Sequence, residues 1–126
     1  MLIAEDDDDA RLLLGQALSH HGAIVFPVSN GEEGVRILLR ERPHVVVSDL
    51  TMPVMGGYEL LKTARQFLAD VPCIAVTGSS LQHQREEAVQ AGFDAHIPKP
   101  VDFRVLIDVI ADLVSGTPSA RTSRRG

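Results

Sequence analysis

Short apolar runs alternate with longer amphipathic segments along the chain. Three β-branched valines, Val45–Val47, form a run without helical periodicity, which is typical of a strand buried on both faces of a parallel sheet. This run stops at Asp49. Four further strands are predicted, at Leu2–Ala4, Ala23–Val28, Pro72–Val76 and Ala95–Pro98.

Apolar residues at helical spacing lie between and after these strands. Helices are predicted over Ala10–His21, Glu32–Arg40, Tyr58–Leu68, Leu81–Ala91 and a last segment that Asp102 caps. Asp8 or Asp9 is expected to cap the first helix. The residues expected to face the core include Leu13, Leu14, Ala17, Leu18, Val35, Leu38, Leu39, Leu60, Leu61, Ala64, Phe67 or Leu68, Val105, Leu106, Val109, Ile110 and Leu113.

Five strands that alternate with five helices predict an α/β fold, a doubly wound parallel sheet with right-handed crossovers. Pro27 cannot donate a ladder hydrogen bond, so its strand is expected at a sheet edge. We expect one domain over residues 1–114. Residues 115–126 have no large apolar side chain and are expected to form a disordered tail without an output domain.

Composition narrows the class of protein. The 126 residues suit one domain of ordinary size, and the single cysteine, Cys73, excludes an internal disulfide. Without a signal peptide or a membrane-spanning run, a cytoplasmic protein is expected. All 17 Asp and Glu residues precede the tail, and this acidic body with few aromatic residues does not resemble a nucleic-acid surface.

Polar residues follow four of the predicted strands. They are Glu5 with Asp6, Asp49, Thr77 and Lys99. The carboxyl ends of parallel strands meet at one edge of a sheet, so these side chains are expected to converge there. Each has a structural alternative: an aspartate or threonine often bonds nearby backbone at a turn, and a lysine is usually a solvated charge.

The three carboxylates form an oxygen-rich negative pocket, which is the kind of ligand set that Mg²⁺ uses. The Lys99 ammonium and the Thr77 hydroxyl suit phosphate oxygens. Such a site can stabilise a phosphoryl group in transfer, and an aspartate can itself be the nucleophile.

Four motifs carry a family resemblance. They are IAEDD at 3–7, SDLTMPVMGG at 48–57, VTG at 76–78 and PKP at 98–100. In this order and spacing, the chain resembles a response-regulator receiver domain of two-component signalling over residues 2–114. The resemblance implies a flavodoxin-like receiver fold with strand order 2-1-3-4-5.

Residue by residue, the resemblance implies that Asp49 is the phosphoacceptor. Glu5, Asp6, Asp49 and the backbone carbonyl of Thr51 would bind Mg²⁺. Thr77 and Lys99 would contact the phosphoryl group, and the peptide bond to Pro100 would be cis. Gly78 would leave the incoming phosphodonor a path.

The chain departs from the family pattern at two positions. His96 stands where many receivers have a tyrosine or phenylalanine whose rotamer reports phosphorylation, and Gly56 replaces a more usual aspartate. An imidazole at the switch position, with GYELL and AGFDAHIPKPVD, resembles receivers fused to hybrid histidine kinases more than transcription factors.

The expected function is therefore that of a phosphoacceptor module, not an enzyme, although it assists its own phosphorylation and dephosphorylation. Its phosphodonor would be a histidine kinase or a histidine phosphotransfer domain. Its output face would be the one that the fourth helix, fifth strand and fifth helix form in the family's fold. Two alternatives stay open. One is a Mg²⁺-dependent phosphatase-like hydrolase, which would want an acid where Thr51 stands; the other is a pseudo-receiver that only docks.

Overall fold

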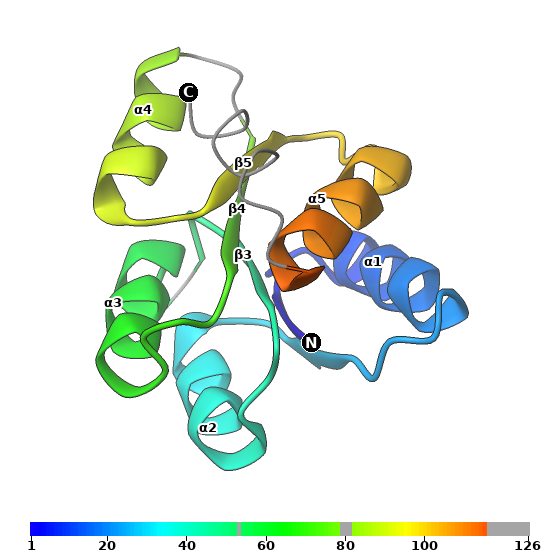
Figure 1. The fold of residues 1–126 in the computed structure, drawn as a ribbon, viewed down its shortest axis with the longest axis horizontal. Helices are drawn as coiled ribbons and strands as arrows, with labels where there is room; N and C mark the ends of the chain where they lie inside the picture. The colour runs from blue at the N-terminus through cyan, green and yellow to red at the C-terminus, as the bar shows by residue number, and fades with distance from the viewer. Residues whose placement is uncertain (53, 79–81, 116–126) are drawn as a thin grey trace.

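The computed structural model describes residues 1–52, 54–78 and 82–115. It contains one five-stranded parallel sheet in the order β2-β1-β3-β4-β5 (Figure 1). The strands are β1 (Leu2–Ala4), β2 (Phe26–Val28), β3 (Val46–Asp49), β4 (Cys73–Thr77) and β5 (Ala95–Pro98). The helices are α1 (Asp8–His20), α2 (Gly31–Glu41), α3 (Gly57–Phe67), α4 (Gln82–Ala91) and α5 (Phe103–Ser115). The predicted fold class and strand order are confirmed.

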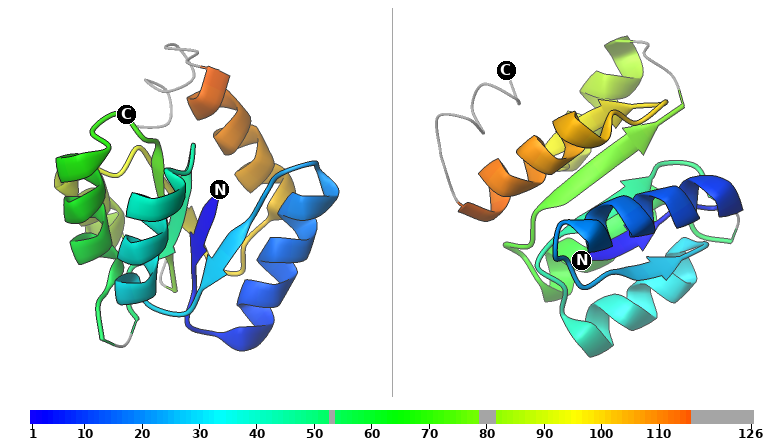
Figure 2. Two further views of the ribbon diagram at one scale, coloured as in Figure 1. Left: turned by 90° about the horizontal axis from the view of Figure 1, so that it is seen from below. Right: turned by 90° about the vertical axis from the view of Figure 1, so that its right-hand side faces the viewer.

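Helices cover both faces of the sheet. Helices α1 and α5 lie together on one face, and α2, α3 and α4 lie on the other (Figures 1 and 2). Strand β1 shows why both layers are needed, since Leu2 and Ala4 pack into one core cluster while Ile3 packs into the other. All three residues are fully buried, as expected where successive side chains point to opposite faces.

Strand β2 is at the sheet edge, where Pro27 was expected to place it. It is shorter than the predicted Ala23–Val28, because β1 begins only at Leu2, which pairs with Phe26. The N-terminal ammonium of Met1 donates instead to the carbonyl of Ile24 at 2.7 Å.

Several helix residues predicted to face the core are exposed. They are Leu13 (55%), Leu39 (46%) and Val105 (47%); of the two alternatives at the end of α3, Phe67 is exposed (53%) and Leu68 packs against the core. Each helix packs on one sheet face and buries only a narrow stripe of side chains. The residue that precedes or follows a buried one in sequence is rotated by about 100° around the helix and can therefore face solvent. In α1 the buried positions are Leu14 and Leu18.

The helix caps differ from expectation in one case. The carboxylate of Asp7, rather than that of Asp8 or Asp9, caps α1 by accepting a hydrogen bond from the Ala10 N–H at 2.8 Å. Asp102 caps α5 as predicted, accepting from the Arg104 N–H at 2.9 Å.

The tail predicted over 115–126 begins one residue too early, because Ser115 still belongs to α5. The rest of that tail lies outside the described residues, as does the predicted first residue of α4, Leu81. Within the described ranges, no helix has the length and apolarity needed to cross a bilayer.

Candidate functional site

The polar residues that follow the strands meet at the carboxyl edge of the sheet. One carboxylate oxygen each from Glu5, Asp6 and Asp49 lies within 4.8 Å of the other two. Glu5 and Asp49 are buried, whereas Asp6 is exposed. Strands β1 and β3 are adjacent, with Ala4 paired to Ser48, so residues that follow these two strands come together.

Lys99 enters this cluster from the end of β5. Its Nζ lies 2.9 Å from Oδ2 of Asp49 and 3.0 Å from Oε1 of Glu5. Burial of Lys99 opposes its charge, but the hydrogen bonds and negative charges of Asp49 and Glu5 outweigh burial and raise the pKa of Lys99. The ammonium therefore stays protonated and offsets part of the charge of the carboxylates.

The two carboxylate oxygens of Glu5 have different partners. Its Oε2 accepts a hydrogen bond from the Asp7 N–H at 3.1 Å. Its Oε1 is fully buried and is ion-paired with the Lys99 ammonium, 3.0 Å away. Burial raises the pKa of Glu5 in spite of the Asp7 N–H and Lys99. A buried oxygen of this kind beside two more carboxylates fits a hard cation such as Mg²⁺.

The Asp49 carboxylate makes both a local turn contact and a contact with the acidic cluster. Its Oδ1 accepts a hydrogen bond from the Thr51 N–H at 3.3 Å, which is the local backbone contact expected of a turn aspartate. Its Oδ2 is paired with Lys99, 50 residues along the chain. The turn bond orients the carboxylate toward the cluster, so the two interpretations do not exclude each other.

Thr77 contacts His96, a pair that the sequence analysis did not predict. Its Oγ1 lies 2.7 Å from Nε2 of His96, and Thr77 is buried while His96 is half-buried. Burial, followed by the charge of Arg85, lowers the pKa of His96. The contact follows from strand register, since Ala75 pairs with His96 and Thr77 with Pro98. Sequence patterns do not give this register, so the contact was missed.

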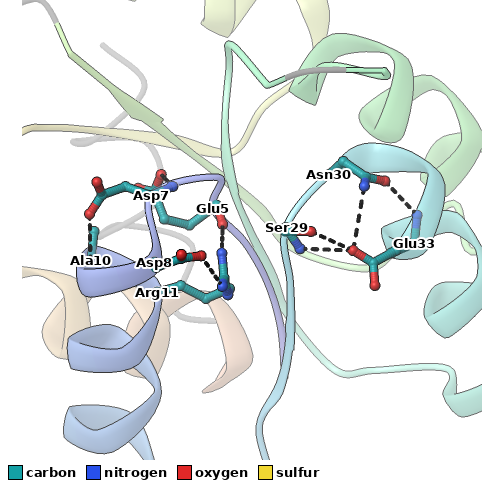
Figure 3. A network of polar contacts seen from close by, with 8 residues as sticks. All are labelled: Glu5, Asp7, Asp8, Ala10, Arg11, Ser29, Asn30 and Glu33. Carbon is teal, nitrogen blue, oxygen red and sulfur yellow. Dashed lines mark hydrogen bonds and ion pairs between the residues drawn. The ribbon is translucent and has the colours of Figure 1, made fainter.

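Arg11 is a second residue that the sequence reasoning missed. Its Nη1 donates to the backbone carbonyl of Glu5 at 2.9 Å, and its Nη2 is ion-paired with Asp8 (Figure 3). The spacing of Asp8 and Arg11, three residues apart on one helix, was the available signal. The contact with Glu5 crosses the β1–α1 turn and had no sequence signal.

Glu5, Asp6, Asp49 and Lys99 lie together at the end of the sheet, and the peptide bond between Lys99 and Pro100 is cis, as the family resemblance implied. A sequence model of the response regulator receiver domain matches residues 1–111. The chain belongs to the response regulator receiver family.

Known proteins similar to this receiver include an uncharacterized 14.6 kDa protein of Leptolyngbya boryana. It is 38% identical over 112 residues, which are 87% of this chain and 86% of that protein. Two longer relatives are the Escherichia coli transcriptional regulatory protein GlrR, at 32% identity, and the Salmonella typhimurium sensor histidine kinase RcsC, at 29%. The receiver spans 28% and 12% of their lengths.

Solved structures agree with the fold. The receiver domain of a signal transduction histidine kinase from Syntrophus aciditrophicus is 33% identical, with a TM-score of 0.83 over 93% of this chain and 90% of that one. A Saccharomyces cerevisiae receiver domain, co-crystallised with a histidine phosphotransfer protein, is 28% identical, with a TM-score of 0.83 over 90% and 87%. Relatives of this receiver thus include both kinase-linked domains and a transcriptional regulator.

The two glycines after Asp49 have different structural roles in this receiver. Gly56 is the N-cap residue of α3 and has no side chain to cap it. Gly57 lies so close to the turn that an added Cβ would be 2.3 Å from the backbone oxygen of Asp49. A residue without a side chain at position 57 therefore lets α3 begin directly against the backbone of Asp49.

Proposed function

We propose that this receiver accepts a phosphoryl group on Asp49 from a phosphohistidine of a histidine kinase or histidine phosphotransfer protein. The observation that carries the proposal is that the buried carboxylate of Asp49 lies among charged side chains. Asp49 is paired with Lys99 on one side and lies beside Glu5 and Asp6 on the other. A nucleophilic carboxylate with charge compensation is what phosphoryl transfer to an aspartate needs.

In the transfer, a carboxylate oxygen of Asp49 bonds to phosphorus while the phosphorus–nitrogen bond of the donor breaks. The bonding electron pair stays on the imidazole nitrogen, and Asp49 becomes an acyl phosphate. Lys99, already 2.9 Å from Oδ2 of Asp49, is in place to bind a phosphoryl oxygen. We assign the Thr77 hydroxyl to a second phosphoryl oxygen.

Glu5, Asp6, Asp49 and the backbone carbonyl of Thr51 are the residues that would hold Mg²⁺. The burial of Glu5 and Asp49 and the 4.8 Å grouping of the three carboxylates support this part. Bound there, Mg²⁺ supplies positive charge that compensates the phosphoryl oxygens during transfer. Lys99 alone must otherwise offset several carboxylates and a phosphoryl group.

His96 is proposed to act as the switch residue. The Thr77 hydroxyl contacts His96 in this structure, so binding of that hydroxyl to the phosphoryl group would change the His96 contact. Among the α4 side chains that the structure describes, Ala88 alone is buried, and weak packing makes a helix easy to displace. These features support signalling through the α4-β5-α5 face.

The similarity to sensor histidine kinases and to a receiver crystallised with a phosphotransfer protein supports the choice of phosphodonor. The proposal includes a cytoplasmic location, a single receiver unit over residues 1–114, and no turnover of an external substrate. It involves neither a membrane nor direct contact with nucleic acid. The exposed Thr51 stands where a phosphatase of this type would need an acid, which weighs against the hydrolase alternative.

The test is incubation with acetyl phosphate and MgCl₂, followed by intact-protein mass spectrometry. One labile phosphoryl group is expected on the protein, and Asp49→Asn should abolish it. Equal labelling of Asp49→Asn would refute the site. Steady hydrolysis of a small phosphate ester would favour the hydrolase, and a folded protein without Mg²⁺ binding would favour the docking pseudo-receiver.

A further inference from the structure

The β1–α1 turn and the first turn of α1 carry five acidic residues in a row, Glu5–Asp9. Like charges at this spacing repel one another, so the turn needs contacts that hold it in one conformation. Among the described residues, two cations form ion pairs or hydrogen bonds with this stretch. Lys99 contacts the carboxylate of Glu5 and belongs to the proposed site, whereas Arg11 has no part in that site so far.

Arg11 joins the two ends of the turn. Its guanidinium donates to the Glu5 carbonyl with one nitrogen and to the Asp8 carboxylate with the other (Figure 3). This side chain is 22% exposed, so its bonds are partly shielded from water. A planar guanidinium with two fixed donors restrains its acceptors more than a flexible ammonium would.

Asp6 is the residue whose position depends most on this restraint. Glu5, before it, is held by its N–H to the Val28 carbonyl at 3.1 Å and by its own carbonyl to Arg11. Asp7, after it, is held by its cap to the Ala10 N–H. Asp6 is exposed, so its position depends on these backbone anchors on both sides.

We infer that Arg11 is a positioning residue for the acidic site: it fixes the β1–α1 turn so that Asp6 and Glu5 present their carboxylates together with Asp49. The inference rests on the proposed function, because the carboxylates it positions are the proposed Mg²⁺ ligands. Arg11 acts through the backbone of Glu5 and through Asp8. In the described part of the chain, its hydrogen bonds go to the Glu5 carbonyl and to Asp8, and not to the three carboxylates of the cluster.

The direction in which Arg11→Ala changes the affinity for Mg²⁺ distinguishes a positioning role from a purely electrostatic one. A guanidinium near an acidic site repels a divalent cation, so removing it should tighten Mg²⁺ binding if Coulomb forces alone matter. Loss of an outer residue that orients metal ligands instead weakens binding by about 10–100-fold. The two explanations predict opposite directions for Arg11→Ala.

The experiment is a titration of ¹⁵N-labelled protein with MgCl₂, followed by NMR, for the wild type, Arg11→Ala and Arg11→Lys. Arg40→Ala is the matched control, since Arg40 is exposed on α2 and pairs with its neighbour Glu41. We expect Arg11→Ala to weaken Mg²⁺ binding about tenfold or more. Arg11→Lys keeps the charge, loses the paired donors, and should bind Mg²⁺ at an affinity between those of the wild type and Arg11→Ala. Arg40→Ala should match the wild type.

The spectra also report folding, because dispersed amide signals show that each variant has kept its structure. If Arg11→Ala does not fold, weaker binding by a folded Arg11→Lys supports the inference and unchanged binding refutes it. Equal or tighter binding by folded Arg11→Ala, with normal binding by the wild type, overturns the inference alone. A wild-type protein with no Mg²⁺-dependent shifts around Asp49 overturns the proposed function and the inference together.

Discussion

Lys99 Nζ lies 2.9 Å from Asp49 Oδ2, although 50 residues separate them in the chain. The same ammonium lies 3.0 Å from Glu5 Oε1. Strand pairing explains the contact, because β3 and β5 both flank β4 and all run in the same direction. One cation therefore connects three strand ends and offsets two buried carboxylates.

Lys99→Ala should destabilise the protein most when Mg²⁺ is absent. Asp49 and Glu5 would lose their cationic partner, which should lower the free energy of unfolding by about 1–3 kcal/mol. Added Mg²⁺ should stabilise the variant more than the wild type, because the ion replaces the missing charge. Urea unfolding with and without MgCl₂ measures both effects. Lys62→Ala, an exposed change on α3, should alter stability by less than about 0.5 kcal/mol.

Gly57→Ala should be strongly destabilising. The new Cβ would lie 2.3 Å from the Asp49 backbone oxygen and 3.0 Å from Leu50 Cα, so backbone must move at a cost of about 2–3 kcal/mol. Gly15→Ala is the control, since no described atom lies within 4 Å of its Cβ. In α1 that change should stabilise by about 0.5–1 kcal/mol. Chemical denaturation measures both, and equal effects would contradict the packing argument.

His96 should make stability depend on pH. Burial lowers its pKa in the folded protein, so the unfolded chain takes up the proton first as pH falls. Its contribution to stability is thus complete above the unfolded value of about 6.5 and declines as pH falls toward the lower folded value. In metal-free protein, His96→Gln should reduce this slope in urea unfolding between about pH 7.5 and about pH 5. The same slope in His96→Gln and the wild type would contradict the prediction, and the exposed His44→Gln should keep it.

Arg65 should be a major stabilising residue away from the site. Its Nη1 donates to the Val71 carbonyl at 2.6 Å, and its Nη2 donates to the Gly92 carbonyl at 2.9 Å and to Asp94 Oδ2 at 2.8 Å. Arg65→Ala removes these three hydrogen bonds together with the ion pair to Asp94, and should cost about 2–3 kcal/mol in chemical denaturation. Arg65→Lys should recover only part of this loss. A cost no larger than that of Arg40→Ala would show that these bonds contribute little.

The pattern of apolar runs was sufficient to predict the layered fold. Every strand and helix was located to within a few residues, because short continuous apolar runs and the helical period of 3.6 are both local features of the sequence. The candidate rim residues also followed from sequence alone. Once all strands are parallel, Asp49 and Lys99 must end at the same edge, whatever their separation in the chain.

Tertiary structure decided which neighbours each residue has. Periodicity placed both Leu13 and Leu14 in the core, but packing on a single sheet face buries only Leu14 of the two. The start of the helical pattern predicted Asp8 or Asp9 as the cap of α1, but the path of the β1–α1 turn places Asp7 there. These outcomes depend on helix rotation and backbone path.

The contact of Thr77 with His96 and that of Arg11 with Glu5 were likewise decided by the tertiary structure. The chain alone determined that these residues exist and which elements carry them. Only the folded structure decided that they touch, because strand register and side-chain direction are set by packing between distant segments and leave no periodic trace in the sequence.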